Sequence, residues 1–115
     1  MTRGVIRVAP GDTVAEARAT FRRHDIHHLP VLDNGKVIGI LTYLQLNKRN
    51  DRELVRDIMS RDVPVVDPET TLRKAAALML NGTSGCLPVM EGEQLAGIIT
   101  TSDLRRAVSG EATLR

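Results

Sequence analysis

The chain contains an internal repeat, and this feature constrains its fold more than any other. Residues 66–104 align with residues 8–46 at a constant offset of 58, without a gap, and twelve of the 39 positions are identical. The longest identical run places Leu87-Pro88-Val89 on Leu29-Pro30-Val31. We therefore expect two copies of one unit, residues 1–50 and 51–115, that together form one globular module.

Each unit has the same predicted order of strand, helix, strand, strand, helix. Short apolar runs closed by a proline predict brief first strands, and apolar residues at helical spacing after a capping threonine predict the helices that follow. Asn-Gly between two apolar runs predicts a two-residue hairpin turn in the first unit, and a turn at Gly92 is its weaker counterpart. The predicted segments are strands at 5–8 and 63–66, helices after Thr13 and Thr71, hairpins at 29–41 and 86–99, and short helices at 43–49 and 101–108.

This order predicts an α/β fold of two pseudo-twofold β-α-β-β-α repeats packed sheet to sheet. A unit of about 58 residues buries little surface alone, and its sheet would have an uncovered face, so the halves should depend on each other. Clefts between related halves are natural ligand sites. A further helix predicted at 54–59 precedes the second unit, and its counterpart would come before residue 1, so the chain either begins abruptly or is a piece of something larger.

Composition argues against several classes of protein. The net charge is only +2, and both signs are interspersed along both halves, so a nucleic-acid partner is not expected. Cys86 is the only cysteine, which excludes a disulfide framework and indicates a reducing compartment. No apolar run approaches a signal peptide or a membrane span, so we expect a soluble, cytoplasmic protein without a membrane partner.

The sequence shows no nucleophilic triad, no Gly-rich phosphate loop and no carboxylate pair suited to acid and base roles. We therefore expect no enzymatic activity and no required cofactor.

At this point the motifs resemble a known family. The sequence is similar to a tandem pair of cystathionine β-synthase (CBS) domains, the Bateman module, over nearly its whole length. The motifs that carry the resemblance are Val63-Pro64-Val65-Val66-Asp67-Pro68, Leu87-Pro88-Val89 and Gly97-Ile98-Ile99-Thr100-Thr101-Ser102-Asp103, with Val8-Ala9-Pro10, Ile26-His27-His28-Leu29-Pro30-Val31 and Gly39-Ile40-Leu41-Thr42 in the first half.

The resemblance implies a regulatory module. Such a module would bind an adenosine-containing ligand, of the AMP, ADP, ATP, S-adenosylmethionine or NAD type, in the cleft between the repeats and pass its state to a partner protein or domain. The alternative is a structural dimerisation module with no physiological nucleotide. The family's habit of pairing modules suggests a homodimer, and the apolar excess at residues 75–80 fits such a contact.

The resemblance also implies the binding residues. Asp103 would accept the ribose hydroxyls, and Thr100, with Ser102 beside it, would lie near the phosphates. One ionised carboxylate can take both hydroxyls of a ribose through charge-assisted hydrogen bonds. The adenine would lie in an apolar slot formed by Ser84, Cys86, Pro88, Val63 and Val65. The competing interpretation is that Thr100 and Asp103 are only a helix-capping pair.

The two repeats differ at this position. The counterpart of Asp103 is Gln45, and that of Ser102 is Leu44, so the first repeat keeps Thr42 and lacks the carboxylate. Losing a charge-assisted bond weakens diol binding by about 1–2 kcal/mol. We therefore predict one good site and a weaker second site, whose expected residues are Thr42, Gln45, His27, His28 and Pro30.

Two further groups have competing interpretations. His24, His27 and His28 could be metal ligands, but adjacent strand residues point to opposite faces, so we expect no metal site and place His27 or His28 near a phosphate instead. Cys86 lies in an apolar run, where a lone thiol is usually a small buried hydrophobe.

Overall fold

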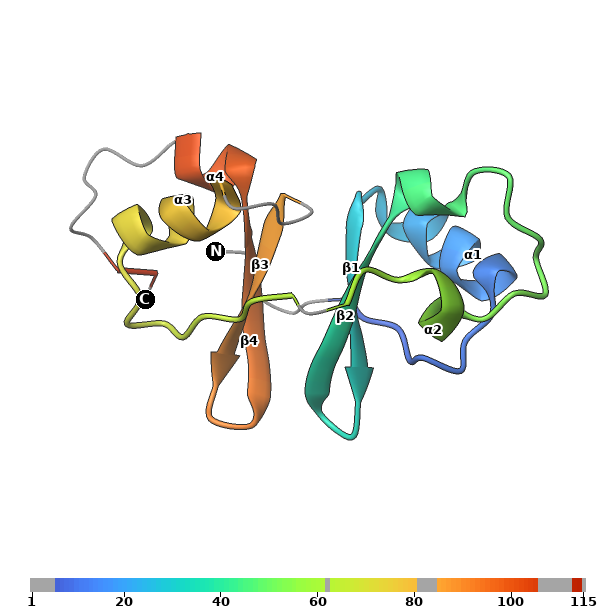
Figure 1. The fold of residues 1–115 in the computed structure, drawn as a ribbon, viewed down its shortest axis with the longest axis horizontal. Helices are drawn as coiled ribbons and strands as arrows, with labels where there is room; N and C mark the ends of the chain where they lie inside the picture. Colours follow the sequence, from blue (N-terminus) through green and yellow to red (C-terminus); the bar gives the residue numbers. More distant parts are fainter. Residues whose placement is uncertain (1–5, 62, 81–84, 106–112, 115) are drawn as a thin grey trace. The chain divides into compact units, whose positions relative to one another are not determined.

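The structure is a computed structural model that describes residues 6–61, 63–80, 85–105 and 113–114. The chain divides into two compact units, one holding Ile6–Asp62 and the other Val63–Arg115. The family fold predicted above is confirmed: each unit is a small α/β structure built on one antiparallel hairpin (Figure 1).

The two units repeat the same elements. The first contains α1 (Val14–His24), β1 (His28–Asp33), β2 (Lys36–Thr42), a single 3-10 turn η1 (Tyr43–Leu46) and α2 (Val55–Ile58). The second contains α3 (Leu72–Leu80), β3 (Cys86–Glu91), β4 (Gln94–Thr100) and α4 (Thr101–Arg105).

The long helices begin where the threonines predict. At the start of α1 the Thr13 hydroxyl accepts the backbone N–H of Glu16 at 3.2 Å, and the Glu16 carboxylate accepts the backbone N–H of Thr13 at 3.4 Å. This reciprocal capping box satisfies two backbone donors that the helix itself cannot pair. In α3 the Thr71 hydroxyl accepts the backbone N–H of Lys74 at 3.1 Å. Asp25 ends α1 in the left-handed conformation, with φ of 49°.

The hairpins follow the predicted turns. Asn34 and Gly35 join β1 to β2 with φ of 51° and 82°, as a two-residue turn of the mirror-image type requires. Gly92 begins the β3–β4 turn with φ of 63°. The register shifts at the same place in each hairpin, between Val31 and Leu32 and between Val89 and Met90, so the bulge is part of the repeated unit.

The predicted first strand of each unit is wrong in its extent. Among the described residues of these segments, a single residue in each forms a parallel bridge, Val8 to Val31 and Val66 to Val89. The backbone N–H of Val8 donates to the carbonyl of Pro30 at 3.1 Å, and its carbonyl accepts the N–H of Leu32 at 2.9 Å. A proline follows two residues later in both segments, and its missing N–H prevents pairing from continuing beyond Val8 and Val66.

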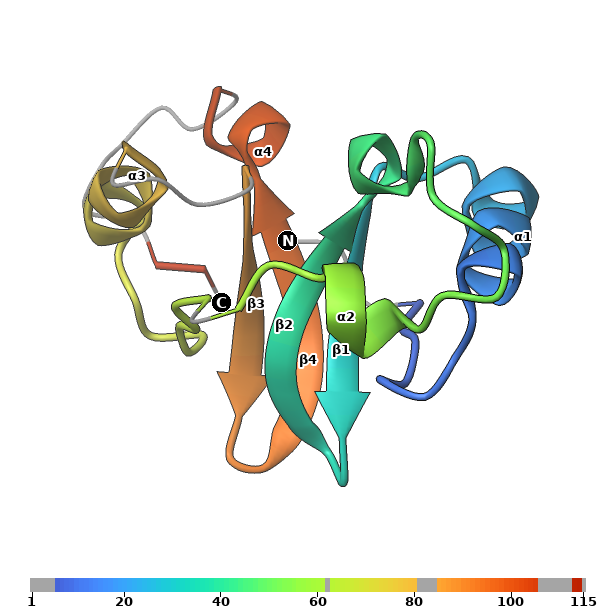
Figure 2. The same cartoon turned by 45° about the vertical axis from the view of Figure 1, so that its right-hand side comes forward.

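Each unit has its own apolar core between the hairpin and the helices. Helices α3 and α4 lie on one side of β3–β4, and α1 and η1 lie on one side of β1–β2 (Figures 1 and 2). Five core positions recur at the offset of 58: Val8/Val66, Ala17/Ala75, Leu29/Leu87, Val31/Val89 and Leu41/Ile99. The predicted repeat is therefore a repeat of the buried side chains.

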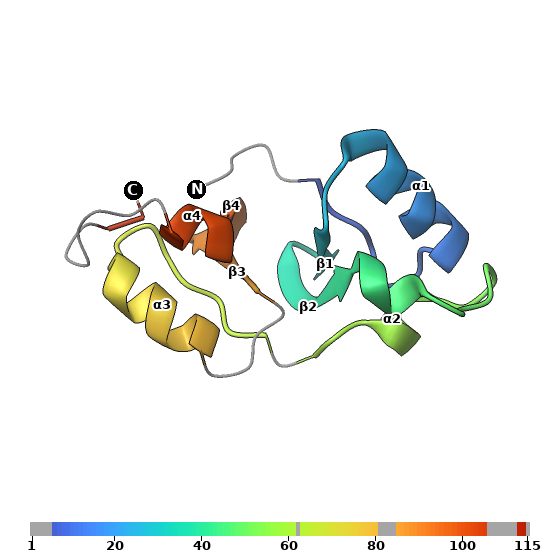
Figure 3. The ribbon, with the colours of Figure 1, turned by 90° about the horizontal axis from the view of Figure 1, so that it is seen from above.

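The segment after the first repeat completes the first unit. Val55 is fully buried in the first core, and Ser60 pairs with Ile40 through backbone bonds of 3.0 and 2.9 Å, which sets α2 beside β2 (Figure 3). The first compact unit thus extends beyond residue 50, which is the boundary predicted from the sequence repeat. In the second unit Leu114 takes this place: its N–H donates to the Thr70 carbonyl at 3.1 Å, and its side chain is buried in the second core. Leu114 thus takes in the second unit the place that Val55 takes in the first.

Candidate functional site

The clearest candidate site is the turn where β4 ends at Thr100 and α4 begins. The backbone N–H of Thr100 donates to Oδ2 of Asp103 at 2.9 Å, and the Thr100 hydroxyl donates to the same oxygen at 3.1 Å. The N–H of Asp103 in turn donates to the Thr100 hydroxyl at 3.4 Å. The N–H of Thr101 donates to the Gly85 carbonyl at 3.3 Å, which ties the turn to the chain just before β3.

The two oxygens of the Asp103 carboxylate differ in their hydrogen bonding. Oδ2 takes both bonds from Thr100, whereas Oδ1 has no hydrogen-bond partner among the described residues. Thr100 and Asp103 are both half-buried, so the side chains remain accessible. A carboxylate oxygen has two lone pairs. Capping by Oδ2 therefore leaves an acceptor, Oδ1, for a ligand with hydroxyl groups.

The first repeat builds the same turn with an amide in place of the acid. The backbone N–H of Thr42 donates to Oε1 of Gln45 at 2.7 Å, and the Thr42 hydroxyl donates to the same oxygen at 3.2 Å. The remaining polar atom of Gln45, Nε2, donates to the Ser60 hydroxyl at 2.8 Å. This side chain has no second acceptor oxygen. The two turns therefore cap their helices in a similar way, but only the turn in the second repeat has a further side-chain oxygen that could accept a bond from a ligand.

The residues predicted to form the adenine slot lie in different surroundings. Cys86 and Pro88 are fully buried on β3, and by strand alternation they face away from Leu87 and Val89 of the core. Burial raises the pKa of the Cys86 thiol from 9.0 to about 12, so the thiol is neutral at physiological pH. Ser84 and the Ser102 side chain lie outside the described residues.

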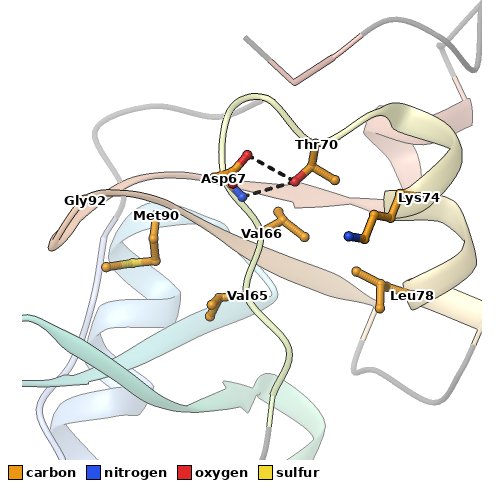
Figure 4. A pocket seen from close by; sticks show the side chains of 8 residues that line it. All are labelled: Val65, Val66, Asp67, Thr70, Lys74, Leu78, Met90 and Gly92. Atoms are coloured by element: carbon orange, nitrogen blue, oxygen red, sulfur yellow. Dashed lines mark hydrogen bonds between the residues drawn. The ribbon is translucent and has the colours of Figure 1, made fainter.

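Val63 and Val65 occupy the stretch that enters the second unit. Val63 is half-buried, and the Val65 side chain is 47% exposed. An exposed valine is available for contact with a ligand. Val65 also lines a cavity in the second unit (Figure 4).

The residues predicted for the weaker second site lie at the start of β1. His27 is exposed, His28 is half-buried and Pro30 is buried. The His27 carbonyl accepts the N–H of Tyr43 at 3.2 Å, which matches the bond between Gly85 and Thr101 in the second repeat. Within the described part of the chain, no three His, Cys, Asp or Glu side chains are grouped around a possible metal position.

An aromatic pair lies near the start of β1, and the sequence did not predict this contact. Phe21 on α1 and Tyr43 on η1 are the chain's two aromatic residues, and their rings meet edge to face with centroids 5.7 Å apart. With His27 they line a cavity of about 320 Å³. The signal available in the sequence was indirect, namely that both aromatics fall in the first repeat.

The comparisons with known proteins agree with the repeated fold. The sequence profile of the CBS domain matches twice, at residues 1–49 and 55–110. The chain belongs to the CBS domain family, and it carries a CBS pair, which is a regulatory module. None of the helices in the described residues has the length and apolar character needed to cross a membrane.

The curated relatives place this pair in proteins of different sizes. Inosine-5'-monophosphate dehydrogenase of Korarchaeum cryptofilum is 39% identical over 104 residues, which are 89% of this chain and 22% of the dehydrogenase. The CBS domain-containing protein YhcV of Bacillus subtilis is 28% identical over 110 residues, 90% of this chain and 79% of YhcV. The chain thus spans about a fifth of the dehydrogenase.

Solved structures with the same fold include a ligand complex. The cytosolic domain of the Mg2+ channel MgtE in complex with ATP superposes with a TM-score of 0.81 and 31% identity, covering 91% of this chain and 45% of that one. The CBS domain protein NE2398 superposes with a TM-score of 0.80 and 26% identity, covering 90% and 87%.

Proposed function

We propose that the chain is a sensory module that binds an adenosine-containing ligand at the Thr100–Asp103 turn and passes its state to a partner. The observation that carries the proposal is the divided carboxylate of Asp103, with Oδ2 engaged in the cap and Oδ1 available. Membership of the CBS family and the likeness to a channel domain solved with ATP support the same ligand class.

The proposed contact is a ribose on Asp103. Two adjacent ribose hydroxyls donate to the carboxylate, with Oδ1 as the first acceptor, because its lone pairs are not used by Thr100. The Thr100 hydroxyl rotates without moving the backbone, so it can turn from Oδ2 to a phosphate oxygen. Oδ2 then regains a lone pair for the second ribose hydroxyl.

The adenine is held by aliphatic side chains and backbone groups in this proposal. The chain has no tryptophan, and its two aromatic residues, Phe21 and Tyr43, contact each other in the first unit, so the proposal assigns no stacked ring to the adenine. The exposed face of Val65 is the described apolar surface nearest in sequence to the expected slot. We expect modest affinity, suited to an abundant metabolite of the AMP, ADP, ATP, S-adenosylmethionine or NAD type.

Binding at one turn per chain follows from the amide at Gln45. Both polar atoms of that amide are engaged, Oε1 by Thr42 and Nε2 by Ser60. A ribose at this turn would compete with the bonds to Thr42 and would meet a neutral oxygen. We therefore assign the strong site to the second repeat, with His27, His28 and Pro30 near a weak or empty one.

Regulation requires that the ligand prefer one state of the module, since a ligand shifts an equilibrium only by its differential affinity. We propose a homodimer as the functional form and a cytoplasmic setting, with an effector protein or domain that reads the state and no reaction catalysed by the chain itself. Exposed apolar side chains at Leu44 and Leu80, 75% and 87% exposed, are candidates for the dimer contact.

A structural dimerisation module is the second candidate function. The observation that favours it is that the Thr100–Asp103 capping box is complete without any ligand. The two candidates differ in their response to nucleotides.

Thermal denaturation with AMP, ADP, ATP, S-adenosylmethionine and NAD tests the proposal, because a ligand that binds only the folded state raises the Tm. The decisive variant is Asp103→Gln, since Gln45 already forms this cap with an amide. We expect a Tm rise with at least one ligand that is lost in Asp103→Gln and kept in Asp33→Gln, a change of an exposed hairpin acid. No Tm rise with any ligand would favour the structural candidate.

A further inference from the structure

The second unit contains a cavity that shares Val65 with the expected adenine slot but neither Thr100 nor Asp103 with the proposed ligand site. Its volume is about 410 Å³, which falls in the range of roughly 300–1,000 Å³ typical of small-molecule pockets. It lies among the 65–70 segment, helix α3 and the end of the β3–β4 hairpin (Figure 4). The lining residues are Val65, Val66, Asp67, Thr70, Lys74, Leu78, Met90 and Gly92.

Four of the eight lining residues, Val65, Val66, Leu78 and Met90, have apolar side chains, and one lining residue, Lys74, is a cation. Lys74 and Leu78 lie one turn apart on the same face of α3, and Lys74 extends from the helix toward Val66 (Figure 4). Within the part of the chain that the structure describes, the Lys74 ammonium makes no ion pair. An unpaired cation above an apolar surface is suited to a ligand with an anionic head and a hydrocarbon body.

The position of Lys74 is unfavourable for the helix. Lys74 lies in the first turn of α3, where the helix dipole favours acidic side chains, and this turn has none. The counterpart of Lys74 in α1 is Glu16, which closes a capping box with Thr13. Helix stability therefore favours an acid at this position, and its replacement by a lysine calls for another explanation.

Other residues of the cavity lining also differ from their counterparts in the first unit. At the offset of 58, Val65 corresponds to Arg7 and Leu78 to Thr20, whereas Val66 and Met90 keep aliphatic counterparts, so the first unit has two fewer apolar residues at these positions and carries its cation at residue 7 rather than on the helix. The larger apolar lining with a cation on the helix is thus particular to the second unit. A feature required only for folding would be expected in both copies.

The charged residues of the cavity lining indicate which class of anionic ligand it suits. Asp67 is also in the lining, and its Oδ1 accepts the Thr70 hydroxyl at 3.3 Å (Figure 4). The same oxygen accepts the backbone N–H of Glu69 at 2.9 Å. One cation and one acid give the lining no net charge, which favours a monoanion over a multiply charged phosphate. We propose that this cavity binds a small aliphatic carboxylic acid, with its carboxylate on Lys74 and its hydrocarbon on Val65, Leu78 and Met90.

The probe is 4-methylpentanoate, titrated into the isotope-labelled full chain and followed by amide chemical shifts, with 4-methylpentan-1-ol as the neutral control. We expect saturable shifts confined to residues of the cavity lining and at least tenfold weaker binding of the alcohol, since a charge-assisted bond is lost. Equal binding of acid and alcohol would overturn the role of Lys74. Shifts scattered over both units, or none at all, would overturn the site.

Lys74→Glu separates loss of binding from loss of folding. The new carboxylate can cap α3 as Glu16 caps α1, so we expect the same or higher Tm together with at least tenfold weaker binding of the acid. Lys36→Glu, an equal change of charge on an exposed residue of the first unit, should keep the affinity. Asp103→Gln should keep it too, so failure of the adenosyl site leaves this test intact. Unchanged affinity in Lys74→Glu, or a preference for inorganic phosphate over the acid, would contradict the proposal.

Discussion

Thr100 and Asp103 are joined by three hydrogen bonds, and two of them end on a single carboxylate oxygen, Oδ2 of Asp103. This relationship reconciles two interpretations that the sequence presents as alternatives. A capping box and a ribose acceptor need not exclude each other when one oxygen caps and the other is available. The cap also fixes the carboxylate before a ligand arrives, which lowers the ordering cost of binding.

The cap makes a first prediction about stability. Asp103→Ala removes both bonds to Oδ2 and should lower the free energy of unfolding by about 1 kcal/mol, the usual magnitude for a lost cap. Asp103→Gln should lower it by less than half of that, because Gln45 accepts the corresponding bonds from Thr42 in the first repeat. Urea unfolding followed by circular dichroism compares the two. Equal losses in both variants would show that the amide does not replace the acid in this cap.

A second prediction concerns the weaker site. Gln45→Asp gives the first repeat the acid of the second, so isothermal calorimetry with the best adenosine ligand should reveal an additional binding event. The affinity at this turn should remain below that at Asp103, because the surrounding residues differ, with His27 and His28 in place of Gly85 and Cys86. Binding unchanged in stoichiometry would show that the carboxylate alone does not decide which repeat binds.

A third prediction tests the packing of the segment that follows the first repeat. A Cβ added at Gly39 would lie 2.7 Å from the Met59 sulfur and 2.7 Å from the Ser60 carbonyl oxygen. Since the Ser60 oxygen is backbone bonded to Ile40, it cannot move freely, and Gly39→Ala should cost about 1–3 kcal/mol of stability.

The control for this change is Gly11→Ala, whose Cβ would meet nothing within 4 Å. Its free energy of unfolding should stay within about 0.5 kcal/mol of the parent. The same urea titration measures both variants. A Gly39→Ala protein as stable as Gly11→Ala would mean that the 59–60 segment does not press on β2.

A fourth prediction follows from the buried thiol of Cys86. Its pKa is raised from 9.0 to about 12, so between these values the unfolded chain loses a proton that the folded chain retains. Stability is then complete below pH 9 and falls as the pH rises toward 12. Unfolding titrations from pH 8 to pH 11 should give a steeper fall for the parent than for Cys86→Ala, which cannot ionise. Parallel curves would show that the thiol ionises equally in both states.

The sequence predicted the helices, hairpins, turns and caps that depend on local residue patterns. The offset of 58 identified both hairpins and both long helices, because buried faces repeat with their secondary structure, and the structure shows five core pairs at the same offset. The Asn34-Gly35 turn and the Thr13 cap have local chemistry that can be read directly. The pairing of Ser60 with Ile40 joins residues twenty apart and leaves no periodic trace, so the role of that segment was not predictable.

The sequence proposes Thr100 and Asp103 as site residues, and it does not predict the geometry of their contact. The spacing of Thr100 and Asp103 is compatible with a cap and with a ribose contact, and only the coordinates show which oxygen is occupied. The cavity beside Lys74 could not be predicted from the sequence, because its lining comes from three separate segments. The residue types of this cavity suggest a ligand only when each lining position is compared with its counterpart in the first unit.

Calorimetric titration of the parent and Asp103→Gln with the best-binding adenosine ligand tests the central claim most directly. The account predicts one strong site per chain in the parent and at least tenfold weaker binding in Asp103→Gln, with the urea midpoint of the variant close to that of the parent. Two equal sites per chain, or full affinity retained in Asp103→Gln, would contradict it.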